Sequence, residues 1–262
     1  MIRKIVKNLY LSIILLFTYI PILVMIVLSF NSSKSRNSFK SFTLDWYKKM
    51  FTDRDVVSAL YNTVSLALIS SVIAVIIGTM AAVAISNMSK RSRNIYMSIT
   101  NIPMLNADVV TGISLMLLFV TFRSILGTEL SYFTVLIAHI TFNIPYVLLS
   151  VLPKLKGASR YEYEAARDLG ATSGQAFFKV VLPEIMPGVI SGFMLAVTMS
   201  LDDFIITYFT KGAGINTIST LVYTSKKRGV SPTLYALSTI MFVSVLIVLI
   251  ITNIVSNREE KK

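Results

Sequence analysis

Six long apolar stretches, almost free of lysine and arginine, constrain this chain more than any other feature. They cover residues 9–30, 60–86, 95–122, 132–152, 188–209 and 232–255 of the 262. Crossing the hydrocarbon core of a bilayer takes about 20 apolar residues, so each stretch can form a transmembrane helix. Only 15% of the residues are charged, against about 25% in soluble proteins. We therefore expect an all-α polytopic membrane protein in which residues 1–262 form a single domain with six transmembrane helices.

The basic residues lie mostly outside these stretches. Arg3, Lys4 and Lys7 precede the first span, and the turn KRSR at 90–93 follows the second. Basic segments beside spans tend to stay in the cytoplasm, so we expect both termini and the loop 153–187 to be cytoplasmic. Such segments also contact anionic membrane lipid. This accounts for the net charge of +12, and we expect no nucleic-acid partner.

The residues needed for several kinds of chemistry are missing. The chain has no cysteine, no G-x-x-x-x-G-K-[ST] loop and no H-E-x-x-H pattern. It therefore lacks the phosphate-binding loop that holds ATP, and thiolate chemistry is excluded. We expect neither an enzyme nor a metal site. The lone histidine, His139 in the fourth span, is expected to hydrogen-bond to a neighbouring helix.

The loop after the fourth span begins with a predicted helix. Its sequence from residue 161 is YEYEAARDLGATSGQAFFKVVLPE. Ser159 is a suitable N-cap, and Glu162 three residues later completes a capping box. The predicted helix covers about 160–169. Gly170 then suits the left-handed position that ends a helix.

A second short helix is predicted to follow, which makes the loop a helix-turn-helix outside the membrane. Thr172 or Ser173 can cap this helix, which should run to a break at Pro183. Three interpretations remain: a plain connector, a DNA-binding element or a docking element for another protein. DNA binding is disfavoured because the acids of the first helix would repel phosphates.

Three segments carry a resemblance to a known family. EAARDLGA at 164–171, followed by VVLPEIMPG at 180–188, resembles the EAA loop of ABC-importer permeases. The surrounding chain resembles the permeases of spermidine/putrescine importers over nearly its full length, with SLDDFIITYFTKGAG at 200–214 as a further match.

The resemblance implies the type I ABC-importer permease fold and a function as the membrane subunit of a polyamine importer. In the family, the EAA loop docks into a cytoplasmic ATPase. The implied partners are two ATPase copies, a second permease that is expected to be a different chain, and an extracytoplasmic polyamine-binding protein. ATP and Mg would be bound by the ATPase, leaving this chain without a cofactor. The implied ATPase-coupling residues are Glu164, Ala165, Ala166, Asp168 and Gly170.

Acidic residues inside the spans suggest a cationic cargo. Asp108 lies in the third predicted span, and Asp202 and Asp203 lie in the fifth; a rise of about 1.5 Å per residue places Asp108 and Asp202 at similar depth. Carboxylates in a membrane are costly, so they should face a cavity or a partner. With Tyr208, these acids form the candidate substrate pathway. An alternative is that one acid caps a helix break, pairs with a neighbouring subunit or contacts the binding protein.

Adjacent aspartates point about 100° apart on a helix. We therefore expect Asp202 and Asp203 to have different roles.

Other functions stay open on the sequence alone. A permease of the same class could carry iron or thiamine instead of a polyamine. A gated ion channel would conduct without ATP, and a membrane enzyme would need catalytic groups that the chain lacks.

Overall fold

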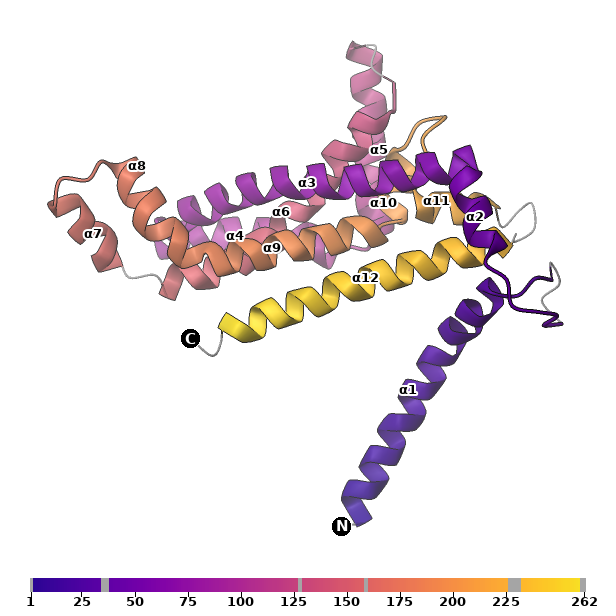
Figure 1. Ribbon diagram of the computed structural model, residues 1–262. Helices are drawn as coiled ribbons and strands as arrows, with labels where there is room; N and C mark the ends of the chain where they lie inside the picture. The colour runs from indigo at the N-terminus through magenta and orange to yellow at the C-terminus, as the bar shows by residue number, and fades with distance from the viewer. Residues whose placement is uncertain (1, 34–37, 127–128, 158–159, 226–231, 260–262) are drawn as a thin grey trace. The chain divides into compact units, whose positions relative to one another are not determined.

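The computed structural model describes residues 2–33, 38–126, 129–157, 160–225 and 232–259, which are helical almost throughout (Figure 1). Among these residues, five helices are long and apolar enough to cross a membrane, or six if one bent pair counts as a single span. The predicted all-α polytopic fold is confirmed. The chain divides into two compact units, Met1–Ser58 with Leu221–Ser244 and Ala59–Thr220 with Val245–Lys262. The single domain expected for residues 1–262 stays a prediction.

The first unit contains α1 (Ile2–Ser29), α2 (Asp45–Thr52), the first turn of α3 (Arg54–Ser86), and parts of α11 (Ile218–Ser225) and α12 (Pro232–Glu259). Trp46 of α2 is buried, and its indole N–H donates to the backbone oxygen of Asn31 at 2.7 Å. The ring of Phe30 stacks on Phe42 and Tyr47, with centroids 5.1 and 5.2 Å apart. These contacts fold the segment after α1 back onto α2.

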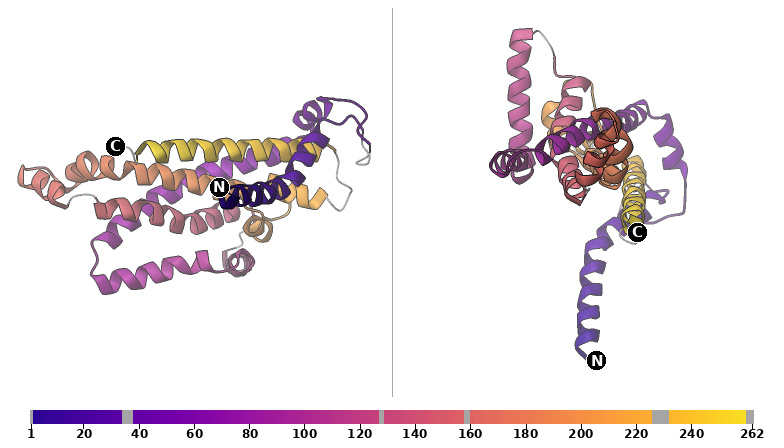
Figure 2. Two further views of the ribbon diagram at one scale, coloured as in Figure 1. Left: turned by 90° about the horizontal axis from the view of Figure 1, so that it is seen from below. Right: turned by 90° about the vertical axis from the view of Figure 1, so that its left-hand side faces the viewer.

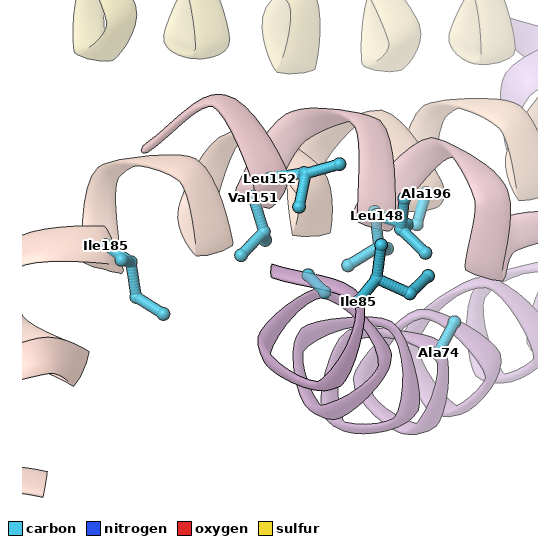
Figure 3. Packing of buried hydrophobic residues seen from close by; sticks show 9 residues of the cluster. Ala74, Ile85, Leu148, Val151, Leu152, Ile185 and Ala196 are labelled. Atoms are coloured by element: carbon cyan, nitrogen blue, oxygen red, sulfur yellow. The ribbon is translucent and has the colours of Figure 1, made fainter. Parts of the chain in front are cut away.

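The second unit is built around α3, α6 (Tyr132–Gly157) and α9 (Leu182–Asp202), which run side by side in Figures 1 and 2. Their common core is drawn in Figure 3, where α3, α6 and α9 all contribute buried side chains; the labelled ones are Ala74, Ile85, Leu148, Val151, Leu152, Ile185 and Ala196.

Small residues let these helices approach closely, as is usual inside membranes. A Cβ on Gly78 of α3 would lie 2.8 Å from Val147 of α6. A Cβ on Gly188 of α9 would lie 2.8 Å from the backbone oxygen of Ser150. The glycines therefore set the spacing of the core.

The stretch 95–122, predicted as one span, consists of two helices. The helices α4 (Lys90–Leu105) and α5 (Asp108–Leu126) are bent by 102°. In Figure 1, α5 leaves the direction of the α3–α6–α9 core steeply. Asn106 has an extended backbone, and Asp108 opens the first turn of α5. An acidic residue is favourable there because the free N–H groups carry partial positive charge.

The break predicted at Pro183 is also wrong. The short helix α8 (Ser173–Ala176) continues through a π-helix (Phe177–Val181) directly into α9. In the π-helix, the N–H of Leu182 bonds to Phe177 five residues back. This wider turn gives the proline ring room, and Pro183 lies in the first turn of α9, where a missing N–H is tolerated.

Candidate functional site

The span predicted at 188–209 is interrupted at Asp203. Helix α9 ends at Asp202, and α10 (Ile205–Thr210) begins two residues after Asp203. Asp203 itself has an extended backbone, with φ −64° and ψ 127°. Its carboxylate accepts the N–H groups of Ile206 and Thr207 at 3.2 and 2.8 Å, and the hydroxyl of Thr207 at 2.6 Å. These bonds satisfy N–H groups of the first turn of α10, so the acid stabilises the break.

His139 of α6 reaches both sides of this break. Its side chain is only 1% exposed. Nδ1 lies 2.5 Å from the hydroxyl of Ser200 in α9, and Nε2 lies 2.9 Å from the hydroxyl of Thr207 in α10. Nε2 is also 3.5 Å from the Asp203 carboxylate. The predicted hydrogen bond to a neighbouring helix is therefore confirmed.

The two adjacent aspartates face different surroundings. Asp202 is exposed, whereas the Asp203 side chain is 8% exposed and bonded into α10. The ring of Phe204 lies 5.5 Å from that of Tyr208, which is 41% exposed. The structure therefore places Asp202 and Tyr208 on an accessible surface and Asp203 inside. Their roles in a substrate pathway stay a prediction.

Asp108, predicted inside the third span, lies at the bend between the two helices of that stretch. It is exposed at the start of α5. One turn later, Gly112 packs against α10, where a Cβ would lie 3.0 Å from the Phe209 ring and 3.5 Å from the backbone oxygen of Ile205. Both exposed acids thus lie beside helix breaks: Asp108 begins α5, and Asp202 ends α9.

Sequence reasoning missed the polar partners of His139. Ser200 and Thr207 bind its two nitrogens, and Ser70 of α3 lies 3.3 Å from Ser200. The available signal was the spacing of Ser200, Asp203 and Thr207 at i, i+3 and i+7, which puts three polar residues on one side of an otherwise apolar helix. Among the described residues, no cluster of three or more His, Asp or Glu side chains could hold a metal ion.

The segment of α7 (Arg160–Asp168) and α8 lies at the opposite end of α9 from the Asp203 break (Figure 1). Helix α7 ends as predicted, with Gly170 at φ +89°. The N–H of Gly170 bonds to Arg167, and the N–H of Ala171 bonds to Ala166, both at 3.0 Å. This is the Schellman pattern of helix ends, which favours glycine. Ser159, the predicted cap of α7, lies outside the described residues.

The second helix of the loop is capped by Thr172. Its hydroxyl accepts the N–H of Gln175, and the Gln175 side chain accepts the N–H of Thr172, which completes a capping box. Of the predicted coupling residues, Ala166 is half-buried and the others are exposed: Glu164, Ala165, Asp168 and Gly170. Leu169 is 90% exposed and Phe178 is 65% exposed. The loop therefore presents apolar and small residues on its surface.

Comparison with known proteins identifies the family. Residues 74–261 match the family described as binding-protein-dependent transport system inner membrane component. The chain belongs to this family. It is 33% identical to the Escherichia coli (strain K12) spermidine/putrescine transport system permease protein PotC over 261 residues, covering 100% of this chain and 97% of the relative. It is 37% identical to the putrescine transport system permease protein PotI of the same strain over 249 residues, covering 94% and 89%.

Solved structures support the fold. A bacterial ABC transporter involved in the import of the acidic polysaccharide alginate contains a chain that matches 98% of this one, with 98% of its own length covered. The TM-score is 0.70 and the sequence identity is 18%. The predicted type I importer permease fold is confirmed. This permease chain is a membrane component of a transport system.

Proposed function

We propose that this permease is the membrane subunit of an ATP-driven polyamine importer that takes up spermidine or putrescine. The observation that carries the proposal is the similarity to two polyamine permeases over nearly the whole chain, at 33% and 37% identity. The exposed Asp202 and Asp108 support a cationic cargo. Placing a carboxylate in a membrane costs free energy, and pairing with a cation offsets part of that cost.

A polyamine has ammonium groups separated by apolar methylene segments. We assign Asp202 and Asp108 to the ammonium groups; a unit charge pair at about 4 Å gains about 4 kcal/mol at an effective dielectric constant near 20. Tyr208, whose ring lies beside Phe204, offers an aromatic face, and a cation over such a face gains about 0.5–2 kcal/mol. Asp203, from the same predicted pathway, would act through the shape of the break.

The loop of α7 and α8 would transmit the work of ATP hydrolysis. We assign its exposed residues Glu164, Ala165, Asp168 and Gly170, together with Ala166, to a groove of the ATPase. The small alanines allow close contact, and Leu169, at 90% exposure, supplies apolar area for that contact. Two ATPase copies would bind the ATP and Mg, so the chain itself would be non-catalytic and without a cofactor.

The remaining partners follow from the proposed type of transporter. A second permease, expected to be a different chain, would complete the pathway, and an extracytoplasmic binding protein would deliver the polyamine. The chain would lie in the bacterial cell membrane, in contact with lipid, with both termini cytoplasmic. The basic residues Arg3, Lys4 and Lys7 support this orientation.

The test is uptake of labelled spermidine and putrescine by cells that lack this chain, with and without the chain restored. Loss of uptake and its rescue are expected. Uptake that does not depend on the chain would overturn the polyamine assignment. Parallel measurements with iron and thiamine cover the other cargoes of this permease class, and uptake of either one in place of polyamines would reassign the substrate.

A further inference from the structure

One continuous chain of hydrogen bonds connects four helices beside the Asp203 break. Its links are Ser70 to Ser200 at 3.3 Å, Ser200 to His139 at 2.5 Å, His139 to Thr207 at 2.9 Å, and Thr207 to Asp203 at 2.6 Å. The first four residues are each 3% exposed or less. Buried networks of this kind are strong because each bond polarises the next in a medium of low dielectric constant.

The carboxylate of Asp203, at the end of the chain, fixes the direction of the bond next to it. An ionised carboxylate only accepts, so the Thr207 hydroxyl donates to Asp203. With a neutral imidazole, the Thr207 oxygen accepts from Nε2–H of His139, and Nδ1 then accepts from the hydroxyl of Ser200. The Ser200 oxygen lies 3.3 Å from the Ser70 hydroxyl, which also donates to the backbone oxygen of Ala67 at 3.4 Å. In this arrangement the hydrogens of Ser200, His139 and Thr207 point along the chain towards Asp203 and stabilise its charge inside the protein.

We propose that His139 is a positioning residue for transport: it holds Asp203 on α10 through this chain, which sets the angle between α9 and α10 and leaves Asp202 as the acid that meets the cargo. Asp203 already accepts three hydrogen bonds from the first turn of α10. Its side chain is only 8% exposed, so it is less accessible to a cation than the exposed Asp202. The part of this inference that concerns cargo rests on the proposed polyamine function.

His139 has this role because α10 cannot hold its own position. The helix has six residues, and helices this short are not stable alone. Its anchors include packing against α5 and α6, a bond from the Thr134 hydroxyl of α6 to the Thr210 backbone oxygen at 2.8 Å, and the bonds through Asp203 and Thr207. The imidazole ring of His139 reaches α9 through one nitrogen and α10 through the other, so it ties the two halves of the broken span to α6.

The first test measures hydrogen exchange of the 203–211 segment in the purified complete transporter, without cargo. His139→Ala should speed exchange of the Ile206 and Thr207 amides about tenfold, the effect of losing one bond in a network to a charged group. His139→Gln places an amide near the position of Nε2 and should restore slow exchange. His139→Asn reaches only towards Ser200 and should not. Unchanged exchange in the alanine variant, or equal exchange in the glutamine and asparagine variants, would overturn the proposal.

The second test uses two double-mutant cycles, each measured by polyamine uptake. One combines changes at His139 and Asp203, and the other combines changes at His139 and Asp202. His139→Ala should lower the maximal uptake rate about tenfold and change KM much less. Combined with Asp203→Asn it should add little, because both changes break the same chain. Combined with Asp202→Asn, which should raise KM, the losses should multiply. Multiplied losses with Asp203→Asn would contradict the proposal.

The two tests separate this inference from the proposed function. If the wild-type transporter moves no polyamine, the cargo assignment fails, but the exchange measurement still decides the role of His139. If the transporter with His139→Ala does not assemble, the glutamine and asparagine variants decide the role of His139, since each replaces the ring with a side-chain amide of similar size. Exchange of the α7 segment serves as the control and should be the same in all variants.

Discussion

A single methyl group on Gly188 should loosen the contact between α6 and α9, whereas the same change four residues later should be tolerated. The Cβ of Gly188→Ala would lie 2.8 Å from the Ser150 oxygen and 3.2 Å from the Cα of Val151, both backbone atoms. At Gly192, the nearest atom is the Cα of Val147 at 3.3 Å. Overpacking costs about 1–3 kcal/mol, and alanine regains about 1 kcal/mol of helix propensity over glycine.

The net expectation is a loss of about 0–2 kcal/mol for Gly188→Ala, towards the upper end because the close atoms belong to the backbone, and a change near zero for Gly192→Ala. At about 2–4 °C per kcal/mol for a chain of this size, the two variants should differ by several degrees in Tm. Thermal unfolding of the purified transporter in detergent measures this difference. If Gly188→Ala melts at or above Gly192→Ala, the close packing of α6 and α9 described above is refuted.

Three further variants test the loops and the candidate pathway. Gly212→Ala would make its Cβ overlap the backbone oxygen of Leu130, so its yield of assembled transporter should fall well below that of Gly188→Ala; a normal yield would contradict the contact. Gly170→Pro should abolish uptake while membrane insertion stays intact, because proline cannot adopt φ +89°. Gly174→Ala, with nothing within 4 Å of its Cβ, is the control that should keep uptake, and normal uptake by both variants would remove the coupling role. Asp202→Asn should raise the KM for polyamines about tenfold or more by removing one charge pair, with Asp202→Glu closer to wild type; equal KM values in all three proteins would remove Asp202 from the pathway.

The parts of the structure that depend on local signals were predictable from the sequence. The end of α7 follows from Gly170, because a left-handed residue after a helix is a property of one position. The cap of α8 follows from Thr172 in the same way. The long apolar helices follow from hydropathy, which depends only on composition along the chain.

The breaks in the spans depend on tertiary contacts and escaped the sequence analysis. The apolar pattern continues past Asp203 to Phe209, so hydropathy predicts one span there. The chain breaks because Asp203 caps α10 and is held by His139, which is 64 positions earlier in the sequence. The bend before Asp108 also lies within a continuous apolar stretch, so hydropathy predicts one span there too. At Pro183 the error was the reverse, because a break was predicted and the helix continues. The π-helix before Pro183 leads directly into α9 despite a proline that would normally end a helix.

The most direct test of the central claim is uptake by the purified transporter reconstituted in lipid vesicles, with labelled putrescine or spermidine and the binding protein on one side and ATP on the other. Polyamine should accumulate against its gradient. This accumulation should require both ATP and the binding protein, and it should be lost in Gly170→Pro. Movement of polyamine down its gradient without ATP would contradict the account and indicate a channel.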